Sequence, residues 1–159
     1  MTKQGVYFWI IMASAFVAAL ALRLARINVE PKVTYDSKVS KPFCGITSVA
    51  TICALRGINT TMSEVYRCAG VNNDGTSSLG CKRALKALGV TSDAVRFKSV
   101  ADLPEGVPIL CALRSMRGLH AVVIIRRSNE VLFIDGQIVN RFPEKHVDAL
   151  TEHVALVPY

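Results

Sequence analysis

The hydrophobic positions of this chain divide it into four stretches with different patterns. Residues 6–22 are apolar except for Ser14, and residues 27–42 are polar and interrupted by two prolines. From residue 44 to residue 88 the apolar residues recur at helical spacing, and after Gly89 they recur at every second position. The pattern therefore predicts helices in the first half of the folded part and strands in the second half.

Three helices and a set of antiparallel strands follow from these periods. The helices are expected over residues 44–55, 61–68 and 78–88. The third helix would place Leu79, Ala84, Leu85 and Leu88 on one apolar side, and Gly89 suits its end. Strands are expected over residues 91–97, 108–114, 120–126, 130–134, 137–141 and 153–157, with a short helix over residues 143–150. Because helices precede strands, the order favours an α+β domain, with helices packed on an antiparallel sheet, over a doubly wound parallel sheet.

Residues 6–22 predict a transmembrane anchor. These 17 residues carry no charge, and a helix of that length spans roughly 25 Å, the short end of a hydrocarbon core. Aromatic residues lie near its start, and Arg23 and Arg26 follow its end, where their side chains can reach lipid headgroups. A cleaved signal peptide and a buried core helix are the alternatives. The basic residues after the segment favour a single-pass membrane protein whose soluble domain lies on the cytoplasmic side.

The composition agrees with one folded domain behind an anchor. We expect the anchor at residues 1–26, a linker or extended arm at 27–42, and the domain at 43–159. Hydrophobic residues make up 51% of the chain and charged residues 19%, which excludes disorder as the main state. Much of the mean hydropathy of +0.35 comes from the uncharged segment. The net charge of +7 permits an anionic partner, and we interpret it as a membrane-surface signal because the basic residues follow the anchor.

The cysteines give little sign of a metal or of a redox motif. There are five, and none forms a C-x-x-C pair, so a zinc ribbon or a thioredoxin-type site is not expected, nor is any cofactor. An odd number leaves at least one free thiol. Cys68 and Cys81 flank a polar loop, and the sequence leaves open whether they pair.

Catalytic chemistry is predicted at Cys44, His120 and Asp135. Cys44 begins the first helix, and the partial positive charge of a helix N-terminus favours the thiolate, which is the reactive form. His120 begins one strand of the expected hairpin, and Asp135 ends its partner, so both would lie at one edge of the sheet. An aspartate there can orient the imidazole toward a thiolate. The three residues would then act as nucleophile (Cys44), general base (His120) and orienting group (Asp135).

Taken singly, each of these residues has an ordinary structural explanation. A cysteine on an apolar helix usually packs in a core, a histidine at a strand end usually faces solvent, and an aspartate before glycine usually serves a turn. Their joint placement favours the catalytic interpretation. The remaining residues of these types are expected to be structural: Cys53, Cys81, Cys111, His146 and His153.

Three segments resemble the C39 family of papain-like cysteine peptidases, which process double-glycine leader peptides. The segment Cys44–Ala50 looks like the active-site helix of that family. Residues 75–79 and the helix that ends at Leu88-Gly89-Val90 resemble a second conserved segment of that family, in which a loop leads into a helix ending in Leu-Gly and a hydrophobic residue. Residues 120–125 and 134–136 resemble its histidine strand and its aspartate strand. The resemblance covers roughly residues 38–159 and implies a papain-like fold with Cys44, His120 and Asp135 as the catalytic triad.

One position departs from the family pattern. The family usually carries a glutamine six residues before the cysteine as an oxyanion donor, and this chain has Lys38 there. Losing one such donor typically costs roughly 10²–10³ in rate. A lysine ammonium is a weak substitute, since its stem is flexible.

The sequence therefore supports two functions. The first is a membrane-anchored cysteine peptidase that cleaves an extended peptide, such as a double-glycine leader. The alternative is a weakly active or inactive C39-like subunit that binds a partner within a membrane protein complex. The expected partners are a peptide or protein substrate, membrane lipid through residues 6–22, and other membrane proteins. Nucleic acid is not expected, because the basic residues are scattered and no reading motif is present.

Overall fold

The computed structural model describes residues 43–71, 75–115, 118–128 and 130–159. The predicted transmembrane segment at residues 6–22, the linker at 27–42 and Lys38 lie outside these ranges. Among the described residues, no helix is both long enough and apolar enough to cross a bilayer. The division of the chain at residues 26 and 42 stays a prediction.

In the described part of the chain, six strands form an antiparallel sheet in which the last strand lies between the first two. The strands are β1 (Ser92–Arg96), β2 (Ile109–Ser115), β3 (Gly118–Arg127), β4 (Glu130–Asp135), β5 (Ile138–Pro143) and β6 (Thr151–Pro158). Their order is β1-β6-β2-β3-β4-β5. The expected hairpin is present, because β3 and β4 pair antiparallel up to Arg127 and Glu130. The predicted α+β architecture is thus confirmed for this part.

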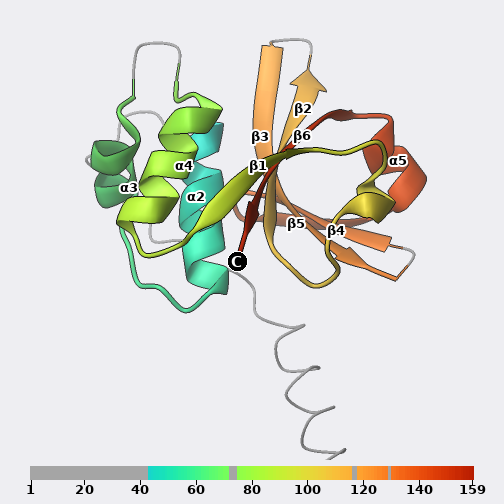
Figure 1. Ribbon diagram of the computed structural model, residues 1–159, viewed down its shortest axis with the longest axis horizontal. Helices are drawn as coiled ribbons and strands as arrows, with labels where there is room; N and C mark the ends of the chain where they lie inside the picture. Colours follow the sequence, from blue (N-terminus) through green and yellow to red (C-terminus); the bar gives the residue numbers. More distant parts are fainter. Residues whose placement is uncertain (1–42, 72–74, 116–117, 129) are drawn as a thin grey trace, which may run out of the picture. The chain divides into compact units, whose positions relative to one another are not determined.

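Helices cover one face of the sheet, and smaller elements cover the other. The helices α2 (Cys44–Leu55), α3 (Met62–Ala69) and α4 (Ser78–Ala87) gather beside the sheet in Figure 1 and share a core with side chains of β2, β3, β4 and β6. A second core on the opposite face includes residues of the short helices η1 (Val100–Asp102) and α5 (Glu144–Asp148). The buried side chains of the central strands therefore have an apolar layer to pack against on both faces.

The two cores explain why strand β3, which carries His120, is so apolar. Val122, Val123, Ile124 and Ile125 are all buried, although successive strand residues point to opposite faces. Val122 and Ile124 belong to the second core, whereas Val123 and Ile125 belong to the core beneath the helices. Burial of consecutive residues on both faces fixes the register of β3, since a slip by one residue would exchange the two cores.

The helix ends follow local capping rules. Thr61 and Glu64 form a capping box at the start of α3, with the Glu64 carboxylate accepting from the Thr61 N–H at 2.9 Å. Ser77 caps α4 by accepting from the Gly80 N–H, and Gly89, with a φ of 82°, follows its C-terminus.

One residue of α4 was placed wrongly by the sequence pattern. Leu79 was expected on the apolar side of this helix, but it is 65% exposed. The buried residues of α4 include Cys81, Ala84 and Leu85. Leu79 precedes Cys81 by two residues, about 200° around the helix, and therefore faces away from them.

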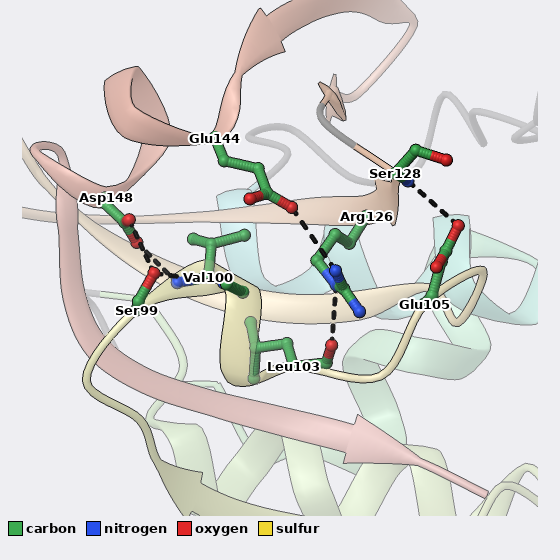
Figure 2. A network of polar contacts seen from close by, with 9 residues as sticks. Ser99, Val100, Leu103, Glu105, Arg126, Ser128, Glu144 and Asp148 are labelled. Carbon is green, nitrogen blue, oxygen red and sulfur yellow. Dashed lines mark hydrogen bonds and ion pairs between the residues drawn. The ribbon is translucent and has the colours of Figure 1, made fainter.

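A polar network joins the elements of the second face (Figure 2). Arg126 donates from Nε to the Leu103 carbonyl at 2.9 Å, and its guanidinium lies 3.6 Å from the Glu144 carboxylate. Asp148 accepts from the Val100 N–H at 2.5 Å, which connects α5 to η1. This network holds the short helices against the sheet on the face away from α2.

Candidate active site

His120 and Asp135 form the polar centre of the predicted site. The β3–β4 register pairs Val123 with Ile134, so Asp135 lies just past that pair and His120 lies three residues before Val123. The two residues are therefore diagonal neighbours on adjacent strands. Their side chains are in contact, with His120 Nε2 2.9 Å from Asp135 Oδ2. Because a carboxylate only accepts, Nε2 must carry the shared hydrogen, and Nδ1 is left for another partner.

Cys44 is the first residue of α2, as the sequence predicted. Its predecessor Phe43 is the N-cap and supplies no side-chain hydrogen bond, and the first helical bond runs from the Thr47 N–H to the Phe43 carbonyl. The N–H groups of the first turn therefore have no partner within the helix. They lie at the positive end of the helix dipole, beside the half-buried Cys44 thiol.

A cavity of about 330 Å³ brings Cys44 and His120 to one place. One wall consists of the first turn of α2 and the segment Gly75–Ser78 with Cys81 of α4. The other wall consists of residues from β2 and from the start of β3, including Leu119, which is 70% exposed. Asp135 is not among the residues that line this cavity, and its hydrogen bond to His120 is what connects it to the site. The structure thus brings together the three predicted residues from a helix and two strands.

Thr76, which also lines the cavity, packs tightly between two glycines. A Cβ added to Gly45 would lie 2.6 Å from the Thr76 methyl carbon, and a Cβ added to Gly80 would collide with the Thr76 hydroxyl and lie 2.7 Å from the Ala69 carbonyl oxygen. The absence of side chains at both positions lets α2 and α4 close around Thr76. This packing positions the residue that directly follows Cys44.

The position of Cys81 at the cavity was not predicted from the sequence pattern. The residue was interpreted as an ordinary core thiol, and it is 2% exposed, but it also lines the cavity with Cys44. Its Sγ lies 3.8 Å from the Gly45 carbonyl oxygen. Burial, together with the nearby charge of Cys44, raises the pKa of Cys81 to about 12. The neighbouring Gly80 was the only available signal, since a glycine inside a helix often marks a close approach.

The other cysteines and histidines lie away from the cavity. Cys53 and Cys111 are buried in the two cores, where burial raises their pKa values to about 11 and about 12. Cys68 is half-buried in α3 and is not joined to Cys81, because all five cysteines are free thiols. His146 lies in α5 and His153 in β6. In the described ranges, no group of three or more cysteine, histidine or acidic side chains is placed to hold a metal ion.

Comparison with protein families identifies one match, which covers most of the chain. The model of the Peptidase C39 family matches residues 32–142. No curated protein matches the chain significantly. The match contains Cys44, His120 and Asp135, and it also covers the position of Lys38.

Solved structures share the fold. The peptidase domain of Streptococcus ComA, a bi-functional ABC transporter involved in a quorum-sensing pathway, is 22% identical, with a TM-score of 0.60 over 73% of this chain and 91% of that domain. A double glycine motif protease from an AMS/PCAT transporter, crystallised with the leader peptide, is 20% identical, with a TM-score of 0.64 over 83% and 96%. The peptidase C39 like domain of a Vibrio parahaemolyticus toxin secretion ATP-binding protein is 10% identical, with a TM-score of 0.65 over 75% and 98%.

Proposed function

The chain belongs to the peptidase C39 family, and from this membership and the geometry of the cavity we propose that it is a cysteine peptidase with Cys44 as nucleophile. His120 is the general base in this proposal, and Asp135 orients it. The single observation that carries the assignment is the 2.9 Å bond from His120 Nε2 to Asp135 beside the cavity that Cys44 lines. This bond leaves Nδ1 as the nitrogen that serves the thiol.

In the proposed reaction, the Cys44 sulfur attacks the carbonyl carbon of the scissile peptide bond. His120 receives the thiol proton and then delivers it to the leaving amine, which departs as a thioester forms on Cys44. Water activated by His120 hydrolyses the thioester and restores the thiol. The N–H of Cys44, at the uncapped start of α2, is the proposed donor to the oxyanion, and Lys38 is a second, weaker proposed donor.

An extended peptide with small residues near the cut is the proposed substrate. Gly45, Gly75, Ala112 and Ala121 line the cavity on both walls, so little side-chain volume stands between a peptide backbone and Cys44. The related AMS/PCAT protease was crystallised with its leader peptide. By analogy, we propose that this chain cleaves after a double-glycine leader.

A synthetic peptide that carries a Gly-Gly leader end tests the proposal. We expect the full chain to cleave it after the second glycine, Cys44→Ala to abolish cleavage, and Cys68→Ala to retain it, because Cys68 lies outside the cavity. Mass spectrometry of the products gives both the rate and the cut position. Cleavage that persists in Cys44→Ala would remove Cys44 as the nucleophile.

A binding role is the second candidate, and Lys38 is the observation that favours it. A chain without the usual glutamine donor can retain the fold and the cavity yet hydrolyse slowly. Under this alternative, the wild-type chain binds the leader peptide without cutting it, and Cys44→Ala binds equally well. Isothermal titration with the same peptide separates the two functions.

We also propose that residues 6–22 anchor the chain in a membrane, with the C-terminal domain on the cytoplasmic side. The uncharged run and the basic residues that follow it support this arrangement. The full chain should remain in the membrane fraction after alkaline extraction, whereas a chain without residues 1–26 should not. A mature N-terminus found near Ala21 would instead identify a cleaved signal peptide.

A further inference from the structure

A second thiol lies against the first turn of α2, where Cys44 is. The sulfur of Cys81 is 3.8 Å from the carbonyl oxygen of Gly45, and a Cβ on Gly45 would lie only 3.0 Å from it. Gly45 is bonded directly to Cys44, and both cysteines line the same cavity. The bare backbone of Gly45 is what allows the sulfur of α4 to approach so closely.

The remaining cysteines do not share this location. Cys53 packs in the core beneath the helices, and Cys111 packs in the core on the opposite face. Cys68 lies in α3 and does not line the cavity. Cys81 is therefore the one thiol of the described residues that shares a cavity with the half-buried thiol of Cys44.

We propose that Cys44 and Cys81 form a reversible disulfide when a hydroperoxide oxidises Cys44. The site is a redox modification site, and it depends on the placement of the two sulfurs rather than on peptidase activity. Cys44 reacts first, since it is half-buried at a helix N-terminus, whereas Cys81 is 2% exposed. Cys81 then acts as the resolving thiol.

The disulfide forms in two steps, and the hydroperoxide is the oxidant. The Cys44 thiolate attacks one oxygen of the hydroperoxide, so that an S–O bond forms, the O–O bond breaks, and the other oxygen leaves as hydroxide or alkoxide. The Cys81 sulfur then attacks the sulfenic sulfur of Cys44. An S–S bond forms, the S–O bond breaks, and the departing hydroxide takes the Cys81 proton to give water. The two thiols lose two electrons in total, and the hydroperoxide accepts them.

Oxidation of Cys44 itself makes the second step easier. The negative charge of Cys44 is one of the two causes that raise the pKa of Cys81, the larger being burial. A sulfenic acid is neutral, so the charge of Cys44 no longer raises the pKa of Cys81 once Cys44 is oxidised. The Cys81 thiolate then forms more readily. The resulting disulfide shields the Cys44 sulfur from further oxidation to sulfinic acid, which is irreversible in most proteins.

Peptide mapping after peroxide treatment tests the proposal without a substrate. The reduced full chain is treated with hydrogen peroxide, free thiols are alkylated under denaturing conditions, and the chain is digested without reductant. We expect a linked pair of peptides that contain Cys44 and Cys81, lighter by two hydrogens than their sum, which disappears after dithiothreitol. Cys68→Ser, the matched control, should give the same pair.

Two outcomes would overturn the proposal. One is a wild-type chain in which Cys44 is recovered as sulfinic acid while Cys81 is fully alkylated, and the other is a Cys44–Cys68 link. Cys81→Ser should convert the reversible loss of the Cys44 thiol into an irreversible one, with sulfinic acid at Cys44. If this variant does not fold, the wild-type map decides alone. Because the map needs no hydrolysis, it can succeed or fail independently of the proposed peptidase function.

Discussion

His120 and Asp135 lie on neighbouring strands, and a 2.9 Å bond joins Nε2 of the imidazole to the carboxylate. The histidine side chain is 35% exposed and the aspartate side chain 42%, so the pair is open to water near the start of β3 and the end of β4. Such a pair contributes little to folding stability. Its value is geometric, since the bond occupies Nε2 of the imidazole and leaves Nδ1 for another partner.

Removal of the imidazole is expected to slow peptide cleavage strongly. His120→Ala should lower kcat/KM by about 10²–10⁴, the usual contribution of general acid–base catalysis. Asp135→Ala should cause a smaller loss, and Asp135→Asn, which retains a carbonyl acceptor, a smaller one still. Initial rates on the leader peptide measure all three. His146→Ala, in the exposed part of α5, is the control, and an equal loss there would contradict the assignment.

The five thiols are expected to differ in their alkylation by iodoacetamide at pH 8. Burial raises the pKa values of Cys53, Cys81 and Cys111 to about 11–12, so these thiols stay protonated and unreactive at that pH. Cys44 and Cys68 are half-buried and should be labelled first. Labelling of the buried three should rise only as the pH approaches their raised pKa values or as the chain unfolds. Labelling of Cys81 as fast as Cys44 in the folded chain at pH 8 would contradict this order.

The packing around Thr76 predicts that the variant Thr76→Ser rescues a substitution at Gly45 but not one at Gly80. Gly45→Ala and Gly80→Ala should each lower the free energy of unfolding by about 1–3 kcal/mol through overpacking. Thr76→Ser removes the methyl carbon that a Cβ on Gly45 would meet at 2.6 Å, so it should partly rescue Gly45→Ala. It should not rescue Gly80→Ala, which also meets the Ala69 carbonyl. Urea denaturation of the single and double variants measures both effects, and equal rescue would contradict the packing.

Lys38 predicts a gain of activity on substitution. If the oxyanion site lacks its second donor, Lys38→Gln should raise kcat on the leader peptide, by at most the roughly 10²–10³ that one donor is worth. KM should change little, because the donor acts on the charge that develops in the transition state. Lys41→Gln is the matched control for the loss of one charge in the same segment. A kcat that stays constant in Lys38→Gln would show that this position does not limit the reaction.

The network on the second face predicts a change in stability alone. Arg126→Met should lower the free energy of unfolding by about 1–3 kcal/mol, because it leaves the Leu103 carbonyl and the mostly buried Glu144 carboxylate without a partner. Thermal denaturation measures the loss. Arg141→Met is the control, since Arg141 is 62% exposed in its pair with Glu130 and should cost at most about 1 kcal/mol. Equal losses in the two variants would contradict a structural role for the network.

Much of the fold was accessible from local pattern. The first helix has the expected bounds, and the start of α4 and the strands of the hairpin agree within two residues. Gly89 at the end of α4 and the antiparallel pairing of β3 with β4 were also confirmed. These features depend on periodicity, caps and turns, which are properties of neighbouring residues. Leu79 was misplaced because an apolar residue in a helix does not by itself define the buried face.

The sequence by itself determined the helices, the strands and the candidate residues Cys44, His120 and Asp135, because each depends on its own neighbours along the chain. Only the tertiary structure decided that His120 and Asp135 are hydrogen-bonded and that Cys44, Cys81 and His120 line one cavity. The reason is that side-chain approach across elements depends on packing between segments distant in sequence. A glycine at position 45 or 80 indicates at most that some segment approaches closely and does not show which one, yet it sets how closely α2 and α4 can pack.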